Sequence, residues 1–349
     1  MMKRITFCAL LMTLFLLLSC GSGSSKTEDP KTIFLTSIAN LGKGFLDVFT
    51  SLSDMITGAF GINADTKKSD IGKYFTDIET TMNTVKKKLQ EEVTKNGNYP
   101  KIKGVVDTFI TNTLDKIAEG AKTAAKGAEG SDAIGGAPTT GQDPAPADAT
   151  SVKALVKGIK TIVGVVLKDN EGNAAATKTA EDDKKDIGKL FEKKDSGTET
   201  EAAKASASIG AVTGADILQA IAKSGETADN NKNIEDATDA ASIAAAKKED
   251  DKKEIKNDAK KDAVIAAGIA LRAMAKDGKF AAKAEEKSAH AVNGAAASAV
   301  GKTLSTLIIA IRNTVDTGLK TISDALATVT QEDKSADSTT PTDAATGGQ

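Results

Sequence analysis

Cys20 is the residue whose type and position most clearly indicate chemistry. It follows Ser19 and an apolar run of 14 residues, Ile5–Leu18, and two positive residues, Lys3 and Arg4, precede that run. The run is shorter than the roughly 20 apolar residues that a membrane-spanning helix needs, and it fits the apolar core of a secretory signal peptide. A small residue directly before a cysteine at this place is typical of a bacterial lipobox. The pattern predicts cleavage after Ser19 and lipid attachment to Cys20.

The remaining cysteine usage agrees with this prediction, although an ordinary signal peptide with an incidental cysteine is the alternative. Cys8 lies inside the apolar run and is removed with it, so the mature chain is predicted to have no free thiol and no disulfide. Residues 21–26 have the glycine- and serine-rich composition of a flexible linker. We expect residues 1–19 to be a signal peptide and residues 20–30 to be a lipidated flexible tether.

No constellation of residues predicts catalysis, a cofactor or a metal site. His290 is the only histidine, and its polar, alanine-rich surroundings indicate an exposed bystander. Gly301-Lys302-Thr303 is similar to the end of a phosphate loop, but the glycine required five places earlier is Ala296 and the pattern there is helical. The acidic runs 181–183 and 249–251 lack calcium-loop spacing and have lysines beside them, so we expect solvated helix starts.

Composition favours helices with small-residue packing. Aromatic residues make up 3% of the chain and tryptophan is absent, whereas a sandwich or barrel needs alternating β-branched and aromatic residues. Loss of Lys3 and Arg4 changes the formal charge from -2 to -4, with both signs well mixed. The chain therefore has no basic footprint for nucleic acid.

Amphipathic helices are strongest near the two ends of the chain. Apolar residues recur every three to five positions in 31–60, 69–94 and 101–125, and a nearly unbroken heptad stripe covers 295–329. The middle has weaker helical patterns, which we place at 152–167, 183–194, 199–223, 234–248 and 250–276.

These patterns predict an all-α fold. We expect an elongated multi-helix bundle, with membrane-proximal N- and C-terminal helices and a distal loop-rich region. The helical ectodomain should cover residues 31–330, with exposed loops at 127–150 and 224–233 where large apolar residues are scarce. Residues 331–349 are polar and are expected to form a disordered tail.

Five segments carry a resemblance to a known family. The chain resembles, over essentially its whole length, the variable large proteins of relapsing-fever spirochaetes and their Lyme-spirochaete relative VlsE. The most specific segment is Lys260–Phe280, which looks like the family's invariant segment 6. The other segments are Lys3–Ile5, Leu18–Cys20, Ser69–Phe75 and Val212–Ile221.

The resemblance implies a lipoprotein anchored in the outer membrane through acylated Cys20 and facing the extracellular side. Its implied role is antigenic variation, in which host antibodies are the partners and one displayed copy is exchanged for another. The resemblance also implies that 260–280 is largely shielded, with a reachable turn at Asp277-Gly278. The apolar pattern of that run predicts five core residues, which are Val264, Ile265, Ile269, Leu271 and Met274.

Three alternatives stay open at this point. An adhesin could bind a host surface ligand through exposed loops or through the lysines at 247–248 and 252–253, although a solvated face is the simpler interpretation. An enzyme has the least support, since no pair of groups suited to acid–base chemistry stands out. The heptad stripes of 31–60 and 295–329 could also pair across a two-fold axis in a homodimer, but we expect them to pack within one chain.

Overall fold

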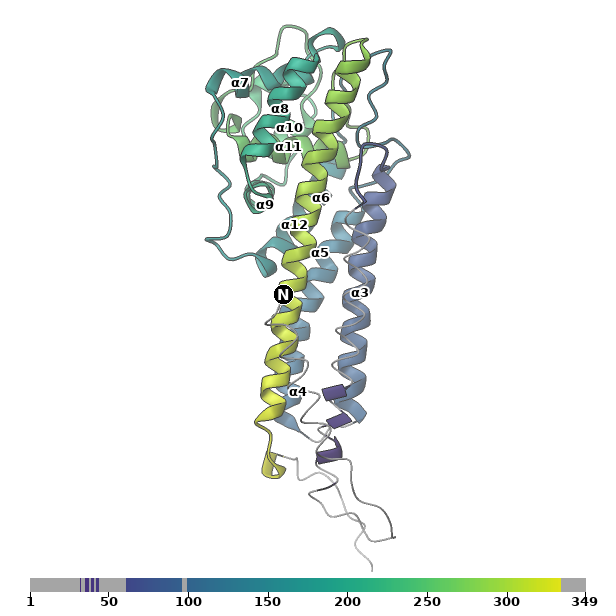
Figure 1. The fold of residues 1–349 in the computed structure, drawn as a ribbon, viewed down its shortest axis with the longest axis vertical. Coiled ribbons are helices and arrows are strands. Elements are labelled where there is room, and N and C mark those ends of the chain that lie inside the picture. Colours follow the sequence, from purple (N-terminus) through teal and green to yellow (C-terminus); the bar gives the residue numbers. More distant parts are fainter. Residues whose placement is uncertain are drawn as a thin grey trace, which may run out of the picture. The chain divides into compact units, whose positions relative to one another are not determined.

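The computed structural model describes residues 61–95 and 99–333, together with isolated positions between 32 and 43. The signal peptide, Cys20, the tether, most of the helix predicted at 31–60 and the tail beyond 333 lie outside the described residues. The described part is all-α, as predicted, and its β-type pairings are isolated bridges (Figure 1). It falls into two compact units, one containing 88–107 and 319–333, the other containing 61–87 and 108–318.

The helix predicted at 69–94 is confirmed as α3 (Lys68–Lys95). Its seam is buried, with every member at most 1% exposed; the members are Ile71, Phe75, Ile78, Met82, Val85 and Leu89. Tyr74, beside this seam, donates a hydrogen bond of 2.9 Å from its hydroxyl to the carbonyl oxygen of Leu304 in α12 (Glu286–Ala327). The predicted apolar face of α3 is therefore a packing face.

The helix predicted at 101–125 contains a change of helical type. It consists of α4 (Pro100–Phe109), one π-helical turn (Ile110–Leu114) and α5 (Asp115–Ala125). Proline suits the first position of α4 because its missing N–H would have no partner inside the helix. At the π turn, Phe109 packs so closely on Gly318 of α12 that a Cβ at Gly318 would lie 2.0 Å from a ring carbon.

The last helix, α12, begins nine residues before the predicted start at 295. Alanine is a strong helix former even where the apolar stripe is weak, which accounts for the longer N-terminal part. The predicted stripe is buried, from Val300 and Leu304 to Leu319 and Ile322. Among the described residues, α12 is the one single helix long and apolar enough to cross a membrane, and the bent pair Glu199–Ala211 and Gly214–Lys223 passes the same test only if taken as one span. In α12, 56% of that apolar window is buried inside the molecule, as in a core helix.

Two glycines bring α5 and α6 (Ala149–Val166) into close contact. A Cβ at Gly158 would lie 2.4 Å from the backbone nitrogen of Ala124 and 2.4 Å from the carbonyl oxygen of Gly120. The helix begins where Asp148 accepts a 2.8 Å hydrogen bond from the Ser151 amide. Sequence analysis predicted this helix at 152–167 without the glycine contact.

The single helix predicted at 199–223 is wrong. The chain forms α8 (Glu199–Ala211) and α9 (Gly214–Lys223), which meet at an angle of 98°. Thr213 and Asp216 form a capping box that starts a new helix. The Asp216 amide donates to the Thr213 hydroxyl at 3.1 Å, and the Thr213 amide donates to the Asp216 carboxylate at 2.7 Å. Gly214 is thus the first residue of a second helix.

The alanine-rich middle has shorter helices than predicted. The region 234–248 contains a 3₁₀ turn (Ile234–Asp236) and α10 (Ala240–Ala245), and 250–276 contains α11 (Asp262–Met274). Asp239 caps α10, and Asp251 has a φ of 69°, which interrupts any helix there. The helix predicted at 183–194 is α7 (Glu181–Asp186), followed by a 3₁₀ turn (Ile187–Phe191).

The segment 127–150 is irregular up to the start of α6, but the prediction that it is exposed is wrong in part. The small residues Ala128, Ala137 and Ala147 are at most 7% exposed, and the larger Ile134 is 3% exposed. Small side chains lose little entropy on burial, and the backbone finds partners in isolated bridges with Lys67, Lys279 and Ala282. Of the exposed loop predicted at 224–233, residues 225–232 are exposed or half-buried, whereas the two end residues, Ser224 and Asn233, are buried.

Candidate functional site

The residues considered for chemistry are separated in the structure. Cys20 lies outside the described residues. His290 is exposed on α12, as predicted. Lys302 donates a 2.8 Å hydrogen bond to the carbonyl oxygen of Ile209, and the Thr303 hydroxyl is buried against the carbonyl oxygen of Ala299 at 2.7 Å. Lys302 and Thr303 thus both bond to backbone carbonyl oxygens, and Gly301-Lys302-Thr303 lies within the helix α12 and not in a phosphate-binding loop.

The acidic runs are paired with lysines. Glu181 contacts Lys184 at 2.9 Å and Lys260 at 2.8 Å, and hydrogen bonds from these two lysines hold the pKa of Glu181 below its usual range. Glu249 pairs with Lys247 at 3.3 Å. Among residues 61–95 and 99–333, no three histidine, cysteine or carboxylate side chains gather as metal ligands would.

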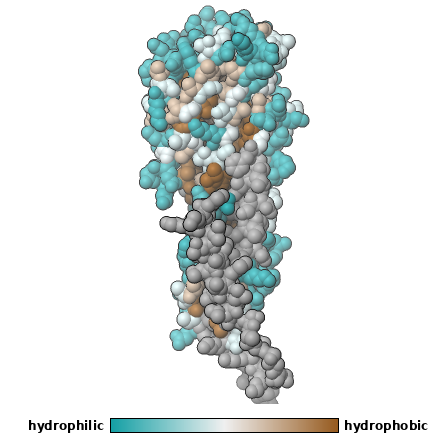
Figure 2. Space-filling view, in the orientation of Figure 1, coloured by the Kyte–Doolittle hydropathy of each residue, from teal (hydrophilic) through white to brown (hydrophobic). Residues whose placement is uncertain are grey.

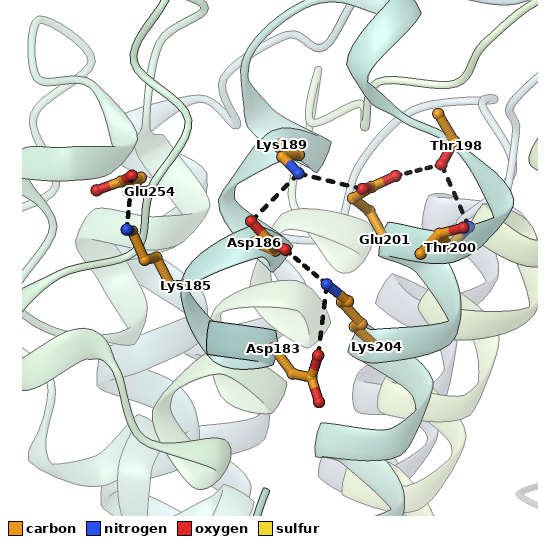
Figure 3. Close-up of polar contacts among 9 residues, drawn as sticks. All are labelled: Asp183, Lys185, Asp186, Lys189, Thr198, Thr200, Glu201, Lys204 and Glu254. Atoms are coloured by element: carbon orange, nitrogen blue, oxygen red, sulfur yellow. Dashed lines mark hydrogen bonds and ion pairs between the residues drawn. The ribbon is translucent and has the colours of Figure 1, made fainter. Parts of the chain in front are cut away.

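A network of alternating charges covers the surface formed by α7, the 3₁₀ turn after it and α8 (Figure 3). Lys204 binds Asp186 at 2.5 Å and Asp183 at 3.4 Å, and Lys189 binds Asp186 at 3.2 Å and Glu201 at 3.4 Å. The hydrogen bond from Lys204 holds the pKa of Asp186 below its usual range. Apart from Glu201, which is buried, these groups are partly exposed. Each exposed pair contributes about 0–1 kcal/mol, and the network is mainly a hydrated outer face.

The lysine-rich face considered for a host ligand is also largely neutralised. Lys248 lies 3.1 Å from Asp143, and Lys252 lies 3.9 Å from Glu235. Lys256 binds the same Glu235 at 2.8 Å. These contacts favour a solvated face with internal pairs over a concentrated anion-binding patch.

Beneath the charged surface lies α11, which carries most of the segment 260–280. The helix contacts α6, α8, α9 and α10 and is buried on nearly all sides (Figure 1). Four of the five predicted core residues are at most 1% exposed, namely Ile265, Ile269, Leu271 and Met274, whereas Val264 is half-buried. At the turn after the helix, Asp277 is exposed and Gly278 is buried.

The first residue of α11, Asp262, is a fully buried carboxylate. It accepts hydrogen bonds from the amides of Lys178 (2.5 Å) and Thr179 (2.9 Å), and from the hydroxyls of Thr179 (2.5 Å) and Ser208 (2.6 Å). Burial raises the pKa of Asp262, but these hydrogen bonds outweigh burial and hold it below the usual range. The charge also lies at the positive end of the helix dipole, where it is stabilising.

Arg272, near the other end of α11, is a fully buried cation. Its Nε donates to the carbonyl oxygen of Lys279 at 2.9 Å, and its Nη1 donates to those of Ala244 (3.0 Å) and Ala246 (2.8 Å). The guanidinium lies 4.8 Å from the ring centre of Phe191 and 5.8 Å from that of Phe280, while Nη2 has no hydrogen-bond partner. Burial lowers the pKa of Arg272 to about 9.

Lys68, the first residue of α3, is a second buried cation at the same end of α11. Its amine donates to the carbonyl oxygens of Arg272 (3.2 Å), Ala273 (2.7 Å), Ala275 (2.6 Å) and Gly278 (3.1 Å). The last carbonyls of a helix lack partners within it and carry partial negative charge, so a cation is stabilising there. Lys68, Asp262 and Arg272 were missed as structural groups. The available signal was that Asp262 and Arg272 lie near the two ends of an otherwise apolar stretch, which marks these two charges but not their partners.

These observations define an all-helical protein with a charge-capped buried helix under a hydrated surface, and comparison with known proteins gives its class. Residues 45–326 match the family model described as Borrelia lipoprotein. The chain is 67% identical to variable large protein 4 and 63% identical to variable large protein 17, both of Borrelia hermsii. The alignments cover 100% of this chain and at least 99% of each relative.

A comparison of the fold with solved structures supports the same family. The crystal structure of the Lyme disease variable surface antigen VlsE of Borrelia burgdorferi matches with a TM-score of 0.73 at 36% identity, covering 84% of this chain and 98% of VlsE. The chain belongs to the variable large proteins of the Borrelia lipoprotein family. The family prediction made from the sequence is thus confirmed.

Proposed function

We propose that this chain is a lipid-anchored antigen of the outer surface, displayed to the host and exchanged in antigenic variation for immune evasion. Its membership in the variable large proteins, with VlsE described as a variable surface antigen, is the observation that carries this proposal. In the proposal, acylated Cys20 binds the outer-membrane bilayer and host antibodies are the partners of the exposed surface.

The distribution of burial supports a displayed antigen. Residues 168–173 and 225–232 are exposed or half-buried, and exposed polar loops tolerate substitution better than packed elements. On the face shown in Figure 2, hydrophilic residues cover much of the surface of the described chain. The large apolar side chains that stand exposed among the described residues are Leu35 and Ile309. Such a surface can change in sequence while the packed helices keep their contacts.

Protease treatment of intact cells, followed by an immunoblot for this chain, tests the proposal. The wild-type chain should be degraded on intact cells, and a Cys20→Ala variant should leave the membrane fraction. A periplasmic protein detected in the same samples must stay protected, as the control for intact outer membranes. Protection of the wild-type chain would place it inside the outer membrane and contradict display.

Exchange in antigenic variation needs a second test. Antisera raised against this chain should bind cells that express it and fail to bind cells that express a sister copy with different 168–173 and 225–232 segments. Grafting these two segments from the sister copy should abolish most antibody binding to the folded protein. Unchanged binding after the graft would show that antibodies recognise other surfaces, and would contradict the role given to these loops.

A further inference from the structure

Three chain segments meet at Lys68. The Lys68 amide donates to the carbonyl oxygen of Asp132 at 3.0 Å, and the amide of Ser69 donates to that of Gly130 at 2.9 Å. A third bond of 2.8 Å joins the Ile134 amide to the carbonyl oxygen of Thr66. The backbone of residue 68 is therefore fixed to the loop 130–134, while its side chain reaches the end of α11.

The segment after α11 is attached to several separate loops by single backbone bonds. The Ala281 amide donates to the carbonyl oxygen of Leu190 and the Lys283 amide to that of Gly197, both at 2.8 Å. The amides and carbonyls of Ala145 and Lys279 exchange bonds of 3.1 Å and 2.9 Å, and those of Gln142 and Ala282 exchange bonds of 2.9 Å and 3.0 Å. These are isolated bridges without a continuous ladder. Local opening occurs most readily where a continuous ladder is missing, and the Lys68 amine adds four bonds to carbonyl oxygens at this end of α11.

The Lys68 amine is placed to hold the turn after α11 against the end of the helix. Lys68 is 1% exposed, and its amine bonds to residues on both sides of the turn, at 272–275 and at Gly278. A Cβ at Gly278 would lie 2.2 Å from the carbonyl oxygen of Arg272, so the turn is closed tightly against the helix end. The charged groups that act on the amine are Asp132, Arg272, Asp277 and Lys279.

We propose that Lys68 is a latch, a positioning residue whose amine holds the segment 275–282 and the loop 129–148 closed over the end of α11. Without the amine, these two segments open together while the remaining helices stay folded. The latch keeps the C-terminal part of the 260–280 run covered. It is a property of the folded chain and holds whether or not the chain is a displayed antigen.

Hydrogen–deuterium exchange of the purified mature lipoprotein in detergent micelles tests the latch. The variants are Lys68→Met, which removes the amine and keeps the apolar stem, and Lys67→Met, which changes the exposed neighbouring lysine as the matched control. In Lys68→Met, amides in 129–148 and 272–282 should exchange at least about tenfold faster, since hydrogen bonds of a charged group are lost. Exchange in α6 should not change, and Lys67→Met should match the wild type.

A second readout uses an antibody raised against a synthetic peptide of residues 268–282. It should bind native Lys68→Met more strongly than the wild type. Unchanged exchange in both segments would overturn the proposal, and so would a uniform increase across all helices, because it would make Lys68 an ordinary core residue.

A milder variant keeps the test decisive if Lys68→Met does not fold. Asp277→Asn removes one carboxylate that favours the charged amine, and asparagine tolerates the left-handed backbone of this residue, whose φ is 64°. Faster exchange confined to 129–148 and 272–282 would support the latch. Wild-type exchange in this variant, together with failure of Lys68→Met to fold, would refute a local latch.

Discussion

Replacing Arg272 by methionine is the sharpest test of how this core is held together. The change removes the charge and the hydrogen bonds to the carbonyl oxygens of Ala244, Ala246 and Lys279, together with a longer one of 3.5 Å to that of Ile243. Methionine fills a comparable space, so a cavity contributes little. Some buried ion pairs can be replaced by apolar residues without loss of stability, because both charged partners are removed together. Here the acceptors are backbone carbonyls that no substitution of a side chain removes.

The expected cost follows from these contacts. The Ala246 carbonyl is left without a donor, which costs about 1–3 kcal/mol. The carbonyls of Ala244 and Lys279 keep the amides of Ala147 and Ala145 as donors and lose only the bond to the guanidinium, about 1 kcal/mol each. The stacking of the cation on Phe191 and Phe280 contributes about 2 kcal/mol more. The lowered pKa of Arg272, about 9, shows that burial of its charge costs free energy, and removing the charge returns part of the loss. The net destabilisation should be about 3–5 kcal/mol, comparable to breaking a buried ion pair from one side.

Chemical denaturation followed by circular dichroism measures this difference, with Arg312→Met as the control. Arg312 is a partly exposed arginine of α12 paired with Asp316 at 3.5 Å, and its loss should cost less than about 1 kcal/mol. The melting temperature of Arg272→Met should fall by about 10 °C. A loss below about 1 kcal/mol for Arg272→Met would refute the argument that its carbonyl partners need a donor.

Three further predictions concern other buried groups. Gly158→Ala should destabilise the protein by about 1–3 kcal/mol through overpacking against α5. In the same helix, Gly164→Ala should be neutral or stabilising, because a Cβ at Gly164 meets nothing within 4 Å. Thermal melts of both variants measure the two effects. Burial lowers the pKa of Lys68 to about 7 from 10.5. Between these two pH values the unfolded chain binds a proton that the folded chain has lost, so stability should rise with pH by up to about 1.4 kcal/mol per pH unit. Denaturant titrations of the wild type and Lys68→Met across this pH range measure the difference. The pKa of Asp262 is lowered in the folded chain, so its contribution to the free energy of unfolding is present above the ordinary carboxyl pKa and is lost as pH falls through the pKa of the folded state. Asp262→Asn should therefore be less stable than the wild type at pH 7, and this difference in stability should shrink in acid.

The long helices could be predicted from sequence because one residue pattern decides them. In α3 and α12, large apolar residues recur at helical spacing and all face the core, so pattern and burial agree. The bounds of the short helices around α11 were predicted poorly, because alanine-rich stretches such as α10 have no distinct apolar face. There the helix ends depend on capping by Asp239 and Thr213 and on the left-handed Asp251, which periodicity does not report.

The buried charges were beyond sequence reasoning for a different reason. Lys68 and Arg272 are 204 residues apart, and each looks like an ordinary surface residue of its own helix. Their partners are carbonyl oxygens, which leave no mark in the residue types. A carboxylate partner at a suitable spacing could have been proposed from the sequence, whereas a set of helix-end carbonyls requires the fold.

The use of backbone acceptors by Lys68 and Arg272 has a consequence for sequence change. Every residue type carries a carbonyl oxygen, so residues 244, 246, 273, 275 and 279 can be replaced without deleting the atoms that receive these hydrogen bonds. A cation held by side-chain carboxylates would instead require matched substitutions at two positions. The anchoring of the buried helix therefore does not depend on the side-chain types of these acceptor residues. What restricts substitution there is packing, because Ala244, Ala246, Ala273 and Ala275 are all 0% exposed.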